Sequence, residues 1–116
     1  MTHKGIAELR HLPRLKYLSL KGVVLTDVGF AELSQLSQLE TLGLDSTAIT
    51  DGQVKHLLSL KNLQTLWLSH SKITETGLKQ LQSLTELKRL YVQGLDVSEE
   101  TVDWFKKTLP ECRLYR

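Results

Sequence analysis

Hydrophobic residues recur along this chain with a period of 24 residues. One column holds Leu15, Leu39, Leu63 and Leu87, and a second, three residues later, holds Leu18, Leu42, Leu66, Leu90 and Leu114. Five further apolar columns keep nearly the same spacing. A coiled coil needs a seven-residue period, so the longer period predicts an array of small structural units that bury their apolar faces by stacking.

Each unit has one half with strand periodicity and one half with helical periodicity. In L-x-x-L-x-L, as at residues 63–68, the last two leucines alternate as in a strand. In the second half, as at residues 77–84, apolar residues lie three apart, which is helical spacing. A hydroxyl residue followed by a carboxylate favours a helix start, and such pairs occur at Thr26-Asp27, Thr50-Asp51, Thr74-Glu75 and Ser98-Glu99. The predicted unit is strand, turn, helix, turn.

This pattern resembles the leucine-rich repeat family over nearly the whole chain, and residues 39–60 give the best copy. The I-T-D-x-G-L variant is similar to repeats in bacterial leucine-rich proteins, in F-box-type receptors and in the group related to ATP synthase subunit s. The resemblance implies an α/β fold, a right-handed solenoid with a curved parallel sheet on the concave face and helices on the convex face. The column that usually holds Asn or Cys in the family holds Val23, Thr47, Ser71 and Leu95. The Thr and Ser hydroxyls can bond the turn backbone, whereas Val and Leu cannot.

We predict a single leucine-rich-repeat domain over residues 1–116. It comprises a half repeat at 1–12, repeats starting near residues 15, 39, 63 and 87, and a C-terminal closing segment at 102–116. The half repeat has a predicted helix at residues 5–12 but no strand before it. The N-terminal end is therefore predicted to be open, and either to continue a longer array or to associate with another copy.

Composition excludes several classes of protein. Leucine accounts for 25 of the 116 residues, and the formal net charge of +2 argues against nucleic-acid binding. No apolar run approaches the length of a membrane-spanning helix, so no membrane partner is expected. One cysteine, Cys112, excludes a disulfide framework. This single thiol and the lack of an N-terminal secretory signal are typical of a cytoplasmic or other intracellular protein.

We predict no catalytic, cofactor or metal site. The histidines lie at positions 3, 11, 56 and 70, in unrelated repeat positions, and no two are four residues apart. The neighbouring acids Glu99 and Glu100 are explained as helix-start residues. Cys112 is interpreted as a packed end residue. The sequence therefore predicts a protein that is not an enzyme.

The candidate binding residues lie on the predicted concave face. The non-leucine residues of each strand point there, and one column reads Ser19, Gly43, Trp67, Tyr91 and Tyr115. With strands about 4.8 Å apart, its three aromatic rings are expected to form a contiguous exposed stripe. Cross-strand packing of the rings is the alternative explanation, but Trp, Tyr and Arg dominate interface energetics. The predicted partner-binding residues are Tyr17, Lys21, Asp45, Thr65, Trp67, His70, Arg89, Tyr91, Gln93 and Tyr115.

The predicted function is a non-catalytic protein–protein interaction module that binds an unidentified partner protein through the concave strand face. The alternatives are a structural subunit or assembly factor within a larger complex, or a fragment of a longer leucine-rich-repeat receptor. Stability that depends on concentration or on a companion chain favours the subunit.

Overall fold

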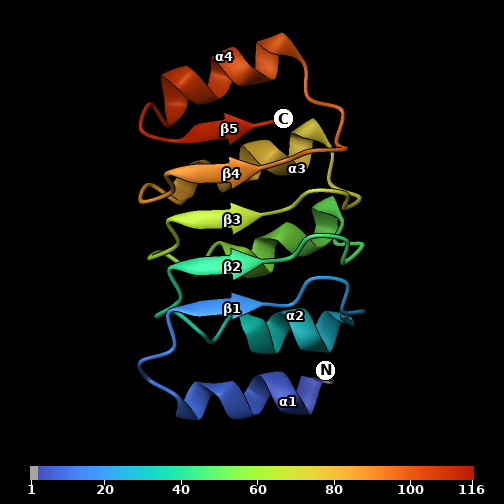
Figure 1. Ribbon diagram of the computed structural model, residues 1–116, viewed down its shortest axis with the longest axis vertical. Helices are drawn as coiled ribbons and strands as arrows, with labels where there is room; N and C mark the ends of the chain where they lie inside the picture. Colours follow the sequence, from blue (N-terminus) through green and yellow to red (C-terminus); the bar gives the residue numbers. More distant parts are fainter. Residues whose placement is uncertain (1–2) are drawn as a thin grey trace.

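The computed structural model describes residues 3–116 as a ladder of short strands joined by helical segments (Figure 1). Residues 1–2 of the predicted half repeat lie outside the described residues. The strands are β1 (Tyr17–Ser19), β2 (Thr41–Gly43), β3 (Thr65–Trp67), β4 (Arg89–Tyr91) and β5 (Arg113–Tyr115). The helical segments are α1 (His3–Glu8), η1 (Leu9–His11), α2 (Asp27–Leu33), η2 (Asp51–Leu57), α3 (Glu75–Lys79), η3 (Gln80–Ser83) and α4 (Glu99–Thr108), where η denotes a 3₁₀ helix.

The five strands form one parallel sheet in the order β1-β2-β3-β4-β5. Their register equals the sequence repeat, because Leu18 pairs with Leu42 and Leu42 pairs with Leu66. In Figure 1, α2 and α3 lie behind the strands, and the opposite face of the sheet carries no helix. We call this uncovered face, formed by the first and third residues of each strand and the residues just after it, the open face. The arrangement confirms the predicted α/β solenoid, with a sheet that does not close on itself.

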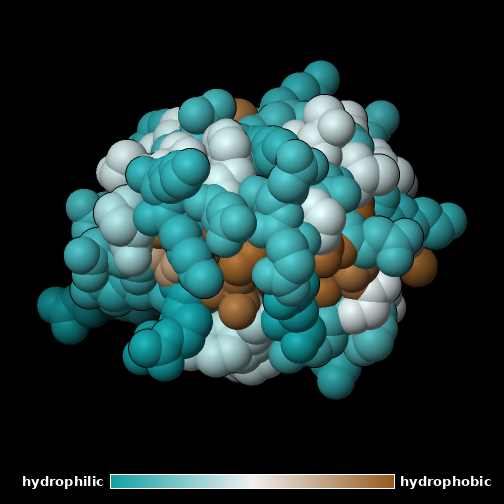
Figure 2. Space-filling model, turned by 90° about the horizontal axis from the view of Figure 1, so that it is seen from above, coloured by the Kyte–Doolittle hydropathy of each residue, from teal (hydrophilic) through white to brown (hydrophobic). Residues whose placement is uncertain are grey.

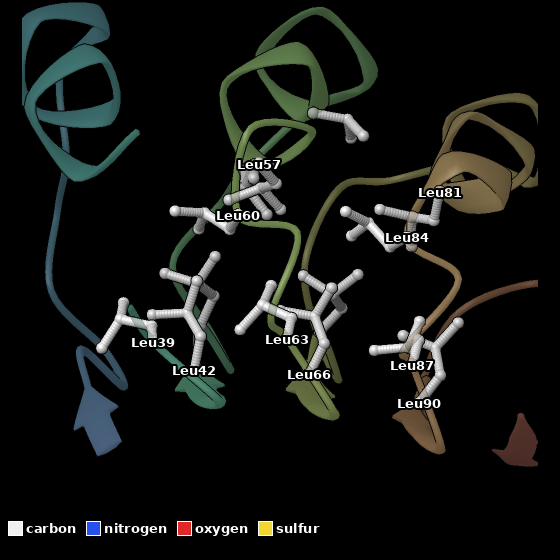
Figure 3. Packing of buried hydrophobic residues seen from close by; sticks show 14 of the residues in the cluster. Leu39, Leu42, Leu57, Leu60, Leu63, Leu66, Leu81, Leu84, Leu87 and Leu90 are labelled. Carbon is white, nitrogen blue, oxygen red and sulfur yellow. The ribbon is translucent and has the colours of Figure 1, made fainter. Parts of the chain in front are cut away.

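The leucine columns fill the space between the sheet and the helical segments. Figure 3 shows Leu42, Leu66 and Leu90 of three successive strands in equivalent positions, with leucines of the helical halves above them. These side chains are fully buried. Burying one leucine side chain stabilises a fold by about 1.5–3 kcal/mol. Each unit shares this core with its neighbours, which explains why the hydrophobic columns extend through the whole array.

The helical halves are less regular than the sequence predicts. Residues 51–57 form only a 3₁₀ helix, and the predicted helix at residues 5–12 is the α1 turn followed by η1, which ends at His11. A 3₁₀ helix rises about 2.0 Å per residue against 1.5 Å for an α-helix, so it spans the unit with fewer residues. Apolar spacing of three residues suits either geometry, which is why the pattern did not distinguish them.

The predicted helix starts are confirmed, because Thr26, Thr50, Thr74 and Ser98 are the N-cap residues of their segments. The hydroxyls of Thr26 and Ser98 each accept from a backbone N–H three residues later, at 3.3 Å. At Thr50, the backbone N–H donates to Gln53 Oε1 at 3.1 Å. The Thr74 hydroxyl instead donates to Asp51 of the preceding repeat.

The carboxylate after each N-cap bonds the repeat that follows it, a role that the sequence interpretation did not include. Asp27 accepts from Gln53 Nε2 at 3.0 Å, and Asp51 accepts from the Thr74 N–H at 2.8 Å. Glu75, Ser98 and Thr101 form the next link, and Glu99 pairs with Arg116 at 2.7 Å. We call this row of acids, Asp27, Asp51, Glu75 and Glu99, the carboxylate ladder. It ties neighbouring repeats together at their helix starts.

The turns after β1, β2, β3 and β4 each use a left-handed backbone residue. Gly22, Ser46, His70 and Gly94 occupy the same repeat position and have φ of 73°, 59°, 59° and 81°. Their position continues the sheet hydrogen bonds, since the N–H of residue 46 donates to Ser69 O at 3.0 Å and that of residue 70 to Gln93 O at 2.8 Å. Glycine adopts this conformation without steric cost, whereas serine and histidine do not.

The hydroxyl column of the turns gives a mixed outcome. Thr47 is buried, and its Oγ1 donates to Leu44 O at 2.7 Å, so here the hydroxyl does bond the turn backbone. Ser71 Oγ is buried without a hydrogen-bond partner in the part of the chain that the structure describes, so it does not make the turn bond that its hydroxyl allows. The turns at Val23 and Leu95 close through backbone bonds to Leu20 O and Val92 O.

Both ends of the array leave apolar surface uncovered. Figure 2 views the end that carries α4 and β5 and shows hydrophobic atoms among hydrophilic side chains. A hollow of about 380 Å³ lies here, lined by residues that include Val102, Phe105 and Leu114. At the other end, Leu12, Val24 and Val28 are 50%, 86% and 52% exposed. The C-terminal segment therefore leaves a hollow at its own end of the array.

Candidate functional site

The open face is built from two residue columns on the strands and one column just after them. The middle residue of each strand points into the core, so the residues on either side of it point away from the helices. The first column holds Tyr17, Thr41, Thr65, Arg89 and Arg113, and the second holds Ser19, Gly43, Trp67, Tyr91 and Tyr115. The third column, after the strands, holds Lys21, Asp45, Ser69 and Gln93.

The aromatic residues of the second column form a continuous stack. The Trp67 and Tyr91 ring centroids are 3.6 Å apart with planes 2° from parallel, and those of Tyr91 and Tyr115 are 4.5 Å apart at 11°. The parallel register places these residues directly opposite each other. The rings cover one another, so they are half-buried, and the expectation of largely exposed rings is wrong. We call Trp67, Tyr91 and Tyr115 the aromatic stack.

A chain of polar contacts runs beside the aromatic stack, across three strands. Asp45 Oδ1 accepts from the Ser69 N–H at 2.9 Å. The Ser69 hydroxyl donates to Gln93 Oε1 at 2.6 Å and accepts from the Gln93 N–H at 3.0 Å. Two predicted binding residues, Asp45 and Gln93, are thereby held in place by a buried serine that belongs to the same column.

The C-terminal half of the open face is basic. Arg89 and Arg113 are exposed and lie opposite each other on β4 and β5. They line a hollow of about 250 Å³ together with Lys88, Glu111 and Tyr115. Arg113 was not among the predicted binding residues, although the 24-residue column that contains Arg89 would have identified it.

The N-terminal half of the open face is hollowed. Ser19 and Gly43 occupy the aromatic column here, and their small size leaves a depression of about 210 Å³. We call it the Trp67 hollow; its lining residues are Tyr17, Ser19, Lys21, Gly43, Asp45 and Trp67. Tyr17, on the edge strand β1, is 65% exposed.

Two predicted binding residues differ from the others in their surroundings. Thr65 is in register between Thr41 and Arg89 but is buried, so it offers little surface to a partner. His70 is exposed at the left-handed turn after β3. A Cβ atom at Gly94 would lie 2.4 Å from His70 Nδ1, so the ring rests against this glycine. His70 is therefore an accessible side chain on the rim of the open face.

Hydrogen bonding and burial explain the shifted pKa values of Glu75 and Cys112. Hydrogen bonds from Ser98 and Thr101 lower the pKa of Glu75 to about 2, which fits its place in the carboxylate ladder. Burial raises the pKa of the Cys112 thiol to about 11, so this group is a poor nucleophile at neutral pH. Among residues 3–116, no group of three His, Cys, Asp or Glu side chains is placed to hold a metal ion.

A parallel ladder with a 24-residue register and one uncovered strand face defines a leucine-rich-repeat solenoid. The family model described as leucine rich repeat matches residues 37–96, just over half of the chain. This chain belongs to the leucine-rich repeat family. Proteins of this family typically serve as interaction modules and are typically not enzymes.

Solved structures show the same fold. An internalin from Listeria monocytogenes matches 94% of this chain with a TM-score of 0.72 and 19% sequence identity. Leiomodin-1 actin-binding site 2 matches 99% of this chain with a TM-score of 0.72 and 16% sequence identity. A leucine-rich repeat protein of Leptospira interrogans matches 95% with a TM-score of 0.61 and 27% identity. This chain spans 30%, 79% and 33% of those three chains. No curated protein matches this chain in sequence.

The described residues contain no helix of the length and apolar character needed to cross a membrane.

Proposed function

We propose that this chain binds a partner protein through the open face of its sheet, and that the aromatic stack is the centre of the contact. The observation that carries the proposal is the alignment of Trp67, Tyr91 and Tyr115 on three successive strands of a face without helices. Tryptophan and tyrosine supply much of the binding energy in protein interfaces, because they bury a large area with few rotatable bonds.

Preorganisation supports the same proposal. The rings already stack in the free protein, and the Asp45–Ser69–Gln93 contacts fix two polar side chains next to them. Side chains that are already ordered lose little conformational entropy on binding. Arg89 and Arg113 add positive charge at one end of the face, which favours a partner with acidic residues at the matching position.

The test is Trp67→Ala, assayed for partner binding and for thermal stability. Truncating a central anchor is expected to cost about 2 kcal/mol or more of binding free energy, roughly thirtyfold in affinity. The partner is first identified by affinity capture and mass spectrometry, and its affinity is then measured by titration. Thermal unfolding of the same variant reports how much of the effect comes from the fold.

A charge reversal on the helical side, Lys55→Glu, is the matched control, because Lys55 is exposed on η2. It is expected to leave partner binding unchanged. If partner binding survives Trp67→Ala and is lost with Lys55→Glu, the partner uses the helical side, and the open-face proposal is wrong.

A further inference from the structure

The aromatic stack ends at Trp67, whose indole ring is covered by another ring on one side only. Tyr91 stacks on that side at 3.6 Å. On the other side lies β2, where the residue in register with Trp67 is Gly43, which has no side chain. The stack is therefore interrupted above Gly43, within the Trp67 hollow.

The space above Gly43 is wide enough for one further planar group. Neighbouring strands lie about 4.8 Å apart, so a flat group above Gly43 lies at stacking distance from Trp67. The hollow of about 210 Å³ is large enough for one side chain and open to solvent on the strand face. A group bound there extends the stack from three planes to four.

A carboxylate is fixed beside this space. Asp45 lies two residues after Gly43 and lines the hollow, and the Ser69 N–H holds its Oδ1 at 2.9 Å. The other charged group that lines the hollow is Lys21, which is exposed in the turn just after the neighbouring strand β1. Within residues 3–116, Lys21 and Asp45 do not form an ion pair.

We infer that the Trp67 hollow binds an arginine side chain of a partner protein, with the guanidinium group stacked on Trp67 and facing Asp45. A guanidinium group is planar and permanently charged, so it uses the indole face and the carboxylate together. A lysine ammonium has no flat face, and an uncharged aromatic ring gains no ion pair with Asp45. The inference rests on the proposed function, since the hollow is part of the open face.

The probe for this site is N-acetyl-arginine methylamide, titrated into the whole protein and followed by NMR at the Trp67 indole N–H and the Gly43 amide. The matched lysine and tyrosine compounds are titrated in the same way. We expect the arginine compound to bind at least about threefold more tightly than the lysine compound, because only the guanidinium stacks.

Three variants test the geometry. Asp45→Asn keeps an oxygen that accepts from Ser69 but removes the charge, so it should weaken arginine binding by about threefold. Lys21→Gln removes the opposing cation and should strengthen binding. Gly43→Phe places a ring against Trp67 and should abolish binding; its Cβ would lie 3.2 Å from the Ser19 hydroxyl oxygen, a side-chain atom that can move. Asp103→Asn, at an exposed acid on α4, is the control and should change nothing.

Equal binding of the arginine and lysine compounds, tighter binding of the tyrosine compound, or insensitivity to Asp45→Asn would overturn the inference. If the arginine compound fails these tests while the captured partner still depends on Trp67, only the arginine site is wrong. If the compound behaves as expected but the captured partner is lost with Lys55→Glu and not with Trp67→Ala, the hollow binds arginine without serving the partner, and the proposed function and the partner's arginine are both wrong.

Discussion

His70 combines an unfavourable backbone conformation with an accessible side chain. Its φ of 59° places it in the turn position where two other repeats have glycine. A side chain in this conformation costs about 1–2 kcal/mol, and glycine costs about 0.5–1 kcal/mol in unfolded-chain entropy. The two effects nearly cancel, so the His70 side chain can be removed here without a large change in stability.

We therefore predict that His70→Gly changes the free energy of unfolding by less than about 1 kcal/mol but weakens partner binding. A rim contact of this kind contributes about 1 kcal/mol to the binding free energy, or roughly fivefold in affinity. Urea denaturation measures the first quantity and titration with the captured partner the second. Ser46→Gly occupies the same turn position without a ring and serves as control. Unchanged partner affinity in both variants would mean that His70 is not part of the binding surface.

The sequence predicted which residues share a column of the open face but not how their side chains meet. The 24-residue period placed Trp67, Tyr91 and Tyr115 in one column, and the register confirms it. The angle of each ring depends on its neighbours in three dimensions, so the stacking, and hence the partial burial, required the structure. Thr65 is likewise buried, although Tyr17 and Arg89 of the same column are exposed.

At the scale of elements, the carboxylate ladder determines how neighbouring repeats are joined. Glu75 accepts hydrogen bonds from the Ser98 N–H at 3.1 Å, from the Ser98 hydroxyl at 2.6 Å and from the Thr101 hydroxyl. These bonds favour the charged carboxylate and lower its pKa from 4.5 to about 2. The helix start of α4 is thus attached to α3 by a group that titrates in acid.

We predict that the Glu75 contribution to stability is present above about pH 5 and is lost as the pH falls towards 2. The unfolded chain binds a proton at this carboxyl near pH 4.5, whereas the folded chain does so only near pH 2. Between these values the unfolded state binds more protons, so acidification favours unfolding. Urea denaturation across this pH range should show that the free energy of unfolding of wild type exceeds that of Glu75→Gln by an amount that shrinks towards pH 2.

The matched control for this titration is Glu86→Gln, at an exposed carboxyl outside the ladder. Glu86 lacks the hydrogen bonds from Ser98 and Thr101 that Glu75 accepts, so its replacement should not reproduce the pH profile of Glu75→Gln. A Glu75→Gln difference with the same pH profile as Glu86→Gln would mean that the carboxylate does not link α3 to α4.

The strand and helix-start positions were predictable from the sequence because each depends on local chemistry. Alternating leucines require a pleated strand, and the hydroxyl–carboxylate pairs are favoured only at a helix N-terminus. The links between repeats were not predictable in the same way. Asp51 and Glu75 each bond the hydroxyl N-cap of the next repeat, Thr74 and Ser98, whereas Asp27 bonds Gln53 instead, so the sequence alone does not tell which side chain each acid reaches.

At the scale of the whole molecule, stability is distributed along the array. Each interior unit is in contact with neighbours on both sides, whereas α1 packs mainly against α2 and has no strand of its own among the described residues. Ile6 is fully buried, but Leu12, Val24 and Val28 at this end are exposed. In a repeat protein, stability is approximately a sum of unit and nearest-neighbour contributions, so a unit that packs against a neighbour on one side only has lower local stability.

We predict that the N-terminal helical segment opens before the rest of the array. The amides of residues 5–11 should exchange with solvent faster than those of Leu42 and Leu66, which lie in interior strands with hydrogen-bonded neighbours on both sides. Native-state hydrogen exchange measures this, and a parallel sedimentation experiment establishes the oligomeric state of the sample. Equal protection of the two regions in a monomer would contradict the prediction, because it would mean that α1 is stabilised without a preceding unit. Protection that rises with protein concentration would identify the N-terminal end as a contact between copies, since association buries the apolar residues exposed there.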